Sequence, residues 1–262
     1  MTDEPLLKVE EVTKSFGGIL ALNGVSLDVF AGEIVGIIGP NGSGKTTLIN
    51  CITGFIKMTS GRVLFRGRNI TGKPAHKIAD MGVTRTFQIM RPYYSLPSYK
   101  NLVIPLFSPR AKRTGGWRGG GKLGDRDTVG IDILEEIGFE RDSFVPYKIA
   151  STLPTGYLKR LELARCLALK PEIIICDEIF SGLSMSEIAS MVPLIERLQM
   201  DGITLMMIEH RLRELFRVAN RVMVLNFGEK VIEGTPEQVM ADEKVKEVYF
   251  GSEEVEEVMS HA

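Results

Sequence analysis

The sequence has few cysteines and no long hydrophobic run. It contains three cysteines in 262 residues, and none has the C-x-x-C spacing of a zinc or redox site. Cys51, Cys166 and Cys176 each fall in an apolar stretch typical of a helix or strand. We therefore expect buried, reduced thiols, as in a cytosolic protein. Because no 18 apolar residues stand together, a membrane-spanning helix is not expected.

An excess of charge of either sign is also lacking. The chain has 32 Lys and Arg residues against 33 Asp and Glu residues, a formal net charge of −1. Proteins that hold nucleic acid neutralise many phosphates with basic side chains, so we expect no nucleic-acid partner. The N-terminal MTDEPLLKVEEV is acidic and lacks the apolar segment of a signal peptide. We expect a cytoplasmic protein, with any role at a membrane exerted through partners.

Glycine, in contrast, is concentrated in GPNGSGKTT at residues 39–47. The stretch matches G-x-x-x-x-G-K-[ST], follows the apolar strand EIVGIIG and precedes the helix-spaced KTTLINCITGF. In such a loop the backbone N–H groups turn toward phosphate oxygens at a helix N-terminus. We expect nucleotide binding by Gly39, Pro40, Asn41, Gly42, Ser43, Gly44, Lys45, Thr46 and Thr47. Lys45 would contact the β- and γ-phosphates, and the Thr46 hydroxyl would bind Mg²⁺.

Two further apolar runs end in charged residues. PEIIICDE predicts a buried strand that ends at Asp177, the position from which a carboxylate holds Mg²⁺ in a nucleotide site, and Glu178 follows it. Since adjacent side chains at a strand end point in different directions, one carboxylate can hold metal while the other activates water. His210 closes LMMIEH, and beside these motifs it is predicted to contact phosphate. The alternatives are an acidic turn and a structural histidine.

The remaining pattern divides the chain. Strands are expected in the first 35 residues and at 171–178 and 202–210, and a hairpin at 221–234, whereas helices are expected between about 92 and 168. The Gly-rich basic stretch 108–127, which contains Trp117, is interpreted as a flexible solvated loop. A basic patch for anionic lipid or a partner is the alternative. The acidic C-terminal end GSEEVEEVMSHA is expected to be a frayed surface helix.

These motifs, in this order, resemble the ATP-binding cassette (ABC) family over nearly the whole chain: the P-loop, RTFQ, a helical lobe, LPTGY, IIICDE, SGLS and IEH. The resemblance implies one ABC ATPase domain over 1–262 of α/β class, a P-loop NTPase core with an antiparallel β subdomain and an inserted α-helical subdomain. Residues 1–91 and 169–235 would form the core with its β subdomain, 92–168 the helical subdomain and 236–262 a helical tail.

The resemblance also implies roles for single residues. Phe16 would stack on adenine, with core packing as the alternative. Gln88 would contact Mg²⁺ or the attacking water and sense a membrane partner. Glu178 is similar to the family's general base and His210 to its γ-phosphate switch. Asp177 would hold Mg²⁺, so that the cofactors are ATP and Mg²⁺.

Three positions depart from the family pattern. LPTGY stands where the family's signature motif LSGGQ is usual. Gly156 retains the glycine that would contact ATP bound to the other subunit, whereas Pro154 offers neither a hydroxyl nor an N–H group. Ile179 replaces a proline, which we expect to change turn stiffness only, and Ser184 replaces an aspartate. Because ATP lies between the P-loop of one subunit and the signature of the other, we expect an asymmetric pair with a paralogue. A pair of identical subunits is the alternative.

The stretches TLINCITGF, GVTRTFQ and IEHRL are most similar to ATPase subunits of branched-chain amino acid uptake systems. This similarity implies an importer subunit, peripheral on the inner face of the cell membrane, that drives separate permeases served by an extracytoplasmic solute-binding protein. The segment 89–98, with Tyr93, Tyr94 and Leu96, would be core or a groove that receives a permease helix. The alternatives are a soluble non-transport ABC ATPase and a degenerate cassette that binds ATP as a regulatory module.

Overall fold

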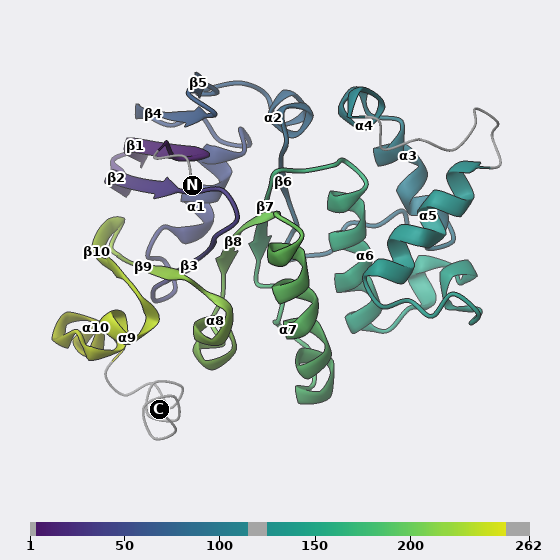
Figure 1. Ribbon diagram of the computed structural model, residues 1–262. Helices are drawn as coiled ribbons and strands as arrows, with labels where there is room; N and C mark the ends of the chain where they lie inside the picture. The colour runs from purple at the N-terminus through teal and green to yellow at the C-terminus, as the bar shows by residue number, and fades with distance from the viewer. Residues whose placement is uncertain (1–3, 115–124, 250–262) are drawn as a thin grey trace.

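The computed structural model of the protein describes residues 4–114 and 125–249 (Figure 1). The strands are β1 (Leu7–Phe16), β2 (Ile19–Val29), β3 (Ile34–Ile38), β4 (Ser60–Phe65), β5 (Arg68–Asn69), β6 (Val83–Arg85), β7 (Ile173–Asp177), β8 (Thr204–Ile208), β9 (Arg221–Asn226) and β10 (Glu229–Gly234). The helices are α1 (Lys45–Ile52), α2 (Ala75–Met81), α3 (Val103–Leu106), α4 (Pro109–Arg113), α5 (Asp125–Glu136), α6 (Thr155–Leu167), α7 (Met185–Met200), α8 (Leu212–Val218), α9 (Pro236–Ala241) and α10 (Glu243–Tyr249). Short 3₁₀ turns are η1 (Tyr99–Leu102), η2 (Val145–Tyr147) and η3 (Ala150–Thr152).

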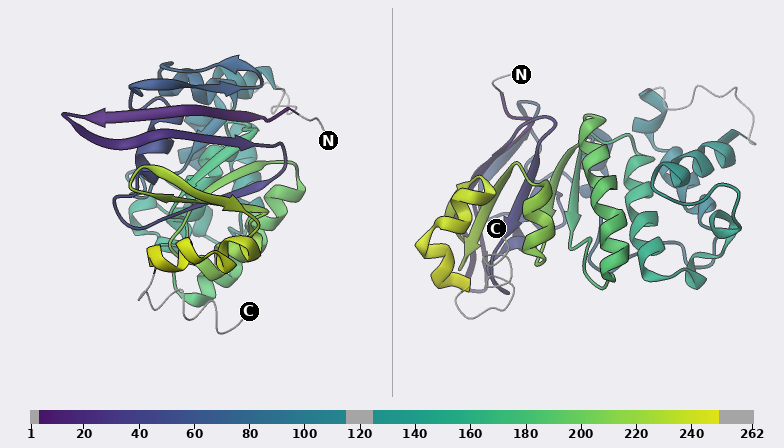
Figure 2. Two further views of the ribbon diagram at one scale, coloured as in Figure 1. Left: turned by 90° about the vertical axis from the view of Figure 1, so that its left-hand side faces the viewer. Right: turned by 60° about the horizontal axis from the view of Figure 1, so that its bottom comes forward.

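The strands form two sheets. The larger has the order β10-β9-β3-β8-β7-β6 and is parallel except for the β9–β10 hairpin, while the smaller, β2-β1-β4-β5, is antiparallel. Helices α3 to α6 lie together at the opposite side of the parallel sheet from the antiparallel sheet (Figures 1 and 2). The predicted α/β fold, with an antiparallel sheet and a helical region added to a parallel core, is confirmed.

Strand β3 separates the two hydrophobic cores. Its five residues are fully buried, as expected for an apolar strand covered on both faces of a parallel sheet. Ile34 and Ile38 pack into the core shared with the helical region, whereas Val35 and Ile37 pack into the core beneath the antiparallel sheet. The glycine-rich loop follows this strand directly, so its first residue is attached to a strand that is buried along its whole length.

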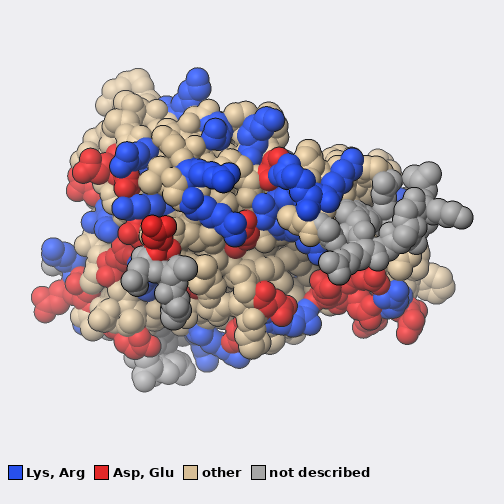
Figure 3. Space-filling view, turned by 45° about the horizontal axis from the view of Figure 1, so that its top comes forward, with Lys and Arg blue, Asp and Glu red and all other residues tan. Residues whose placement is uncertain are grey.

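The basic stretch corrects one prediction. Residues 108–114 are not a flexible loop, because Ser108 caps the short helix α4 by accepting a hydrogen bond from the Ala111 N–H, with Pro109 at its first position. Arg110 pairs with Glu172, and Arg113 pairs with Asp80. These pairings favour a structural role for both arginines. Lys and Arg side chains gather on one face of the molecule, with Asp and Glu side chains among them (Figure 3). Trp117 lies outside the described residues.

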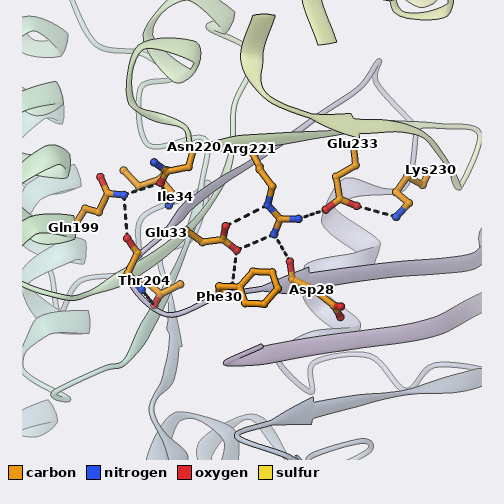
Figure 4. A network of polar contacts seen from close by, with 11 residues as sticks. Asp28, Phe30, Glu33, Ile34, Gln199, Thr204, Asn220, Arg221, Lys230 and Glu233 are labelled. Atoms are coloured by element: carbon orange, nitrogen blue, oxygen red, sulfur yellow. Dashed lines mark hydrogen bonds and ion pairs between the residues drawn. The ribbon is translucent and has the colours of Figure 1, made fainter. Parts of the chain in front are cut away.

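A network of polar contacts joins the two sheets (Figure 4). Arg221, at the start of β9, donates to both carboxylate oxygens of Glu33, to Glu233 of β10 and to the Asp28 carbonyl of β2. Burial of Arg221 acts to lower its pKa, but these acidic partners raise the pKa above its usual value. The guanidinium therefore ties the antiparallel sheet to the hairpin at one end.

All three cysteines are buried and free, as predicted. Among the described residues no helix is long and apolar enough to cross a membrane. The C-terminal end predicted as a frayed helix lies outside the described residues from position 250 onward.

Candidate functional site

The glycine-rich loop leaves β3 in a conformation that only glycine tolerates. Gly39 has φ 153°, and a Cβ there would lie 2.0 Å from the carbonyl oxygen of Leu225. Gly44 caps helix α1 with φ 104°, and a Cβ there would lie 2.6 Å from the Ala21 carbonyl oxygen. The loop is thus pressed between β9 and β2, and its backbone leads into the N-terminus of α1.

Lys45 points back into this loop. Its Nζ donates to the carbonyl oxygens of Gly39 and Pro40, at 2.6 and 2.9 Å. Burial lowers the pKa of Lys45, while the carboxylates of Glu178 and Asp177 act in the opposite direction. The ammonium therefore lies within the electric field of Asp177, the last residue of β7, and of Glu178, which follows it.

Glu178 lies between the two other residues that the motifs singled out. Gln88 Nε2 donates to Glu178 Oε2 at 2.8 Å, and His210 Nε2 lies 3.3 Å from Glu178 Oε1. Gln88, Glu178 and His210 lie just after the carboxyl ends of β6, β7 and β8 respectively, and these are neighbouring parallel strands. The carboxyl ends of parallel strands meet at one edge, where α/β proteins place their ligands.

The backbone of Glu178 is held in an unusual conformation. Its φ of 52° is left-handed, which in a non-glycine residue costs on the order of 1–3 kcal/mol and is kept only where the surroundings impose it. The Glu178 N–H donates to Ile208 O at 2.8 Å, and the buried Lys159 donates its Nζ to the Glu178 carbonyl at 2.7 Å. The motifs gave no signal for Lys159.

Asp177 contacts a different residue from those that Glu178 contacts. Arg85 Nη2 donates to Asp177 Oδ2 at 2.9 Å, and Arg85 Nη1 donates to Asn50 Oδ1 of helix α1 at 2.6 Å. Burial raises the pKa of Asp177, although Arg85 acts to lower it. Arg85 was missed from sequence, although it lies three residues before Gln88 in RTFQ.

Glu209 is the other missed residue. It is 2% exposed and lies between Ile208 and His210. Its Oε1 accepts a hydrogen bond from Phe180 N–H at 2.9 Å, and the Ile179 N–H also donates to its carboxylate. Burial raises the Glu209 pKa to about 8. A proline at position 179 would lack this N–H, so Ile179 supplies a hydrogen-bond donor that a proline could not. The expected change in turn stiffness stays a prediction.

Comparison with known proteins gives the family. The family description "ABC transporter" matches residues 22–181, and "Branched-chain amino acid ATP-binding cassette transporter" matches residues 229–255. The chain belongs to the ABC transporter family of ATP-binding cassettes. It is 37% identical over 257 residues, 95% of this chain and 98% of the relative, to the high-affinity branched-chain amino acid transport ATP-binding protein LivG of Escherichia coli.

Solved ABC cassettes have the same fold. The ADP conformation of MJ1267, an ATP-binding cassette of an ABC transporter, is 33% identical with a TM-score of 0.82, covering 94% of this chain and 99% of that chain. The cassette MJ0796, as a dimer in a post-hydrolysis state bound to ADP and Pi, is 27% identical with a TM-score of 0.75, covering 88% and 98%. The chain is accordingly a nucleotide-binding ABC ATPase.

In this ABC cassette the predicted adenine-stacking residue is exposed. Phe16 has 45% of its surface accessible at the end of β1, so the alternative of core packing is wrong. Lys14 Nζ lies 4.6 Å from the centre of its ring. An open aromatic face beside a cation is compatible with stacking, which stays a prediction.

The signature of this cassette begins helix α6 at Pro154. Proline caps the helix without a side-chain hydrogen bond, and Gly156 packs against Glu187 so closely that a Cβ would lie 2.4 Å from its Oε1. Glu187 belongs to a capping box with Ser184, which replaces the family's aspartate. Thus the Glu187 carboxylate connects Gly156 of the LPTGY segment with Ser184 of the SGLS segment within one chain.

Proposed function

We propose that this chain is the ATP-hydrolysing subunit of an ABC importer for branched-chain or related amino acids. The observation that carries the proposal is the position of Glu178, held by Gln88 and His210 at the edge of the sheet that also ends in the P-loop and Asp177. The names of LivG and of the matched C-terminal family support the class of solute. The class of solute therefore rests on similarity to these proteins, since we expect the solute to be bound by other subunits.

The residues of the P-loop bind and orient the triphosphate. The backbone N–H groups of 39–47 hold phosphate oxygens at the N-terminus of α1, and Lys45 exchanges its loop carbonyls for the β- and γ-phosphates. Phe16 stacks on the adenine.

Glu178 acts as the general base. Its carboxylate accepts the proton of the attacking water, while Gln88 orients that water and His210 contacts the γ-phosphate. Thr46, Gln88 and Asp177 supply hydroxyl, amide and carboxylate oxygens, the donors that Mg²⁺ prefers. Mg²⁺, when bound, neutralises charge on the β- and γ-phosphate oxygens.

A second cassette completes the site. Gly156 offers its N–H to the γ-phosphate bound by the partner's P-loop, and ATP closes the pair. Since Pro154 and Ser184 remove groups on this chain's signature side, we infer that a paralogue supplies the intact signature to Lys45 and Glu178. The dimeric cassette MJ0796 supports pairing as such, and a second copy of this chain is the competing partner.

Membrane permeases dock beside Gln88. A groove of about 270 Å³ lies between the core and the helical region and is lined by Phe55, Phe87 and Arg91 among others. Ile89 lies between Phe87 and Arg91 in sequence and is 75% exposed. Tyr93, Tyr94 and Leu96 are exposed as well, which favours a docking surface over core packing for the segment 89–98. The cassette would thus lie at the inner face of the membrane, and a solute-binding protein would act indirectly from the other side.

The first experiment is light scattering of Glu178→Gln with and without Mg²⁺-ATP, together with its ATPase rate. Loss of turnover with retained ATP binding would support the general base. An ATP-dependent dimer of the variant would indicate that LPTGY works and would favour identical subunits. A monomer that binds ATP would favour a paralogous partner.

Pro154 and Ser184 favour one second candidate, a degenerate cassette that binds ATP as a regulatory module. An ATPase rate that is the same for Glu178→Gln and the wild type would support this candidate and contradict the proposal. Stable co-purification with soluble proteins in place of permeases would instead indicate a non-transport ABC ATPase.

A further inference from the structure

A buried lysine from the signature helix reaches the backbone of the proposed general base. Lys159 lies in α6, three residues after Gly156, and is only 5% exposed. Its Nζ donates to the carbonyl oxygen of Glu178 at 2.7 Å. Lysine is almost never fully buried without partners, so its place here requires a reason.

The surroundings keep the ammonium in place. Burial lowers the pKa of Lys159, but four carboxylates act to raise it: Glu209, Glu178, Asp177 and Glu162. They come from three sides, the ends of β8 and β7 and helix α6 itself. Lys159 is therefore one of the cations that offset the acidic side chains beneath the site, together with Arg85, which pairs with Asp177, and Arg165, which pairs with Glu162.

The Lys159 contact fixes one side of a strained turn. Glu178 has φ 52°, its N–H is bound to Ile208 O, and the next two N–H groups are bound to the Glu209 carboxylate. The Glu178 carbonyl has Lys159 as its partner. Rotation of this peptide would swing the side chain of Glu178 away from Gln88 and His210.

We propose that Lys159 is a positioning residue, which fixes the peptide after Glu178 and thereby directs its carboxylate. The inference rests on the proposed role of Glu178 as general base. It also gives the signature helix a direct connection to the hydrolytic site of the same chain. A misplacement of a reacting group by about 1 Å can cost on the order of a hundredfold in rate.

The test compares four variants of the full chain with the wild type: Lys159→Met, Lys159→Arg, Lys148→Met and Glu178→Gln. Lys159→Met removes the donor, Lys159→Arg keeps a donor and the charge, and Lys148→Met makes the same change at an exposed lysine. We expect Lys159→Met to lower kcat at least tenfold with KM for ATP within twofold. Lys159→Arg should recover most of kcat, and Lys148→Met should match the wild type.

Hydrogen exchange of peptides covering 177–184 gives a readout that does not depend on turnover. In Lys159→Met we expect faster exchange of the amides of 178–180, with protection of α6 unchanged. A folded Lys159→Met with wild-type kcat or wild-type protection of this turn would overturn the inference. If Lys159→Met fails to fold, Lys159→Gln replaces it under the same criteria.

Glu178→Gln separates the two proposals. If it keeps the wild-type rate, the general-base assignment fails, whatever Lys159 does. If it loses activity while Lys159→Met does not, only the positioning role fails. Lower kcat that Lys159→Arg does not recover would indicate a packing role and would also count against the inference.

Discussion

Asp177 and Arg85 form a buried ion pair, with 2.9 Å between Oδ2 and Nη2 and side chains that are 3% and 7% exposed. Arg85 also donates to Asn50, and its guanidinium lies 4.8 Å from the ring centre of Phe87. The carboxylate proposed to hold Mg²⁺ is thus connected to helix α1 by one side chain. Loss of either partner leaves a charge without compensation in a buried site.

Arg85→Met is therefore expected to be strongly destabilising. Breaking a buried pair costs about 3–5 kcal/mol, because the remaining charge is unpaired. Adding Asp177→Asn should recover a large part of this loss, since the neutral amide needs no counter-charge. Urea unfolding without nucleotide measures the free energy of unfolding of the single and the double variant. A loss under about 1 kcal/mol for Arg85→Met would contradict the prediction.

Glu209 is expected to make stability fall as the pH rises. Its folded pKa of about 8 lies above the ordinary 4.5, so the folded state binds more protons between these values. The contribution is fully present below about pH 4.5 and is lost as the pH rises through about 8, on the order of 5 kcal/mol in all.

Glu209→Gln removes this titration. Its unfolding free energy relative to the wild type should therefore increase from pH 5 to pH 8.5, as followed by urea titrations at several pH values. Glu237→Gln, at an exposed site on α9, is the control. Parallel pH profiles for Glu209→Gln and the wild type would show that Glu209 is not protonated in the folded protein.

Gly156→Ala tests the packing of the signature. The added Cβ would lie 2.4 Å from Glu187 Oε1, so the carboxylate must move away and the Gly156 N–H becomes crowded. We expect weaker ATP-dependent association in the Glu178→Gln background, measured by light scattering with the partner cassette. The double variant with Glu187→Ala relieves the clash and should restore association. If it does not, the methyl group itself blocks the partner's ATP.

Ile89→Asp tests the docking surface proposed for the segment 89–98. The side chain is 75% exposed, so the change should leave the ATPase rate of the isolated chain and its unfolding free energy nearly unchanged. Co-purification with the permeases should be lost, because a charge would enter an apolar interface. Ile19→Asp, with 74% exposure on the antiparallel sheet, is a matched control that should keep the permeases.

The residues that could be predicted from the sequence are those that stand in motifs next to an apolar strand. The P-loop, Asp177, Glu178 and His210 each stand at the end of an apolar strand, and parallel strands bring such ends together. The start of α4 could also have been predicted, since Ser108 followed by proline is a helix start signal.

Three residues of the site could not be found in this way. Arg85 meets a partner 92 residues away, Lys159 one 19 residues away and Glu209 one 29 residues away. In sequence each looks like an ordinary charged residue near a motif. Arg85, Lys159 and Glu209 come close to Asp177 and Glu178 only when the chain is folded. Burial there changes the pKa of all three residues.

Strand β3 has a consequence for the slowest motions of the protein. Because alternate residues of β3 belong to different cores, its hydrogen bonds break only when both cores open. Amides of 34–38 should then exchange by global unfolding, whereas those of the helical region can exchange by local opening. The phosphate loop is thus attached to one of the strands that we expect to lose their structure last, so it should keep its shape while the helical region opens locally.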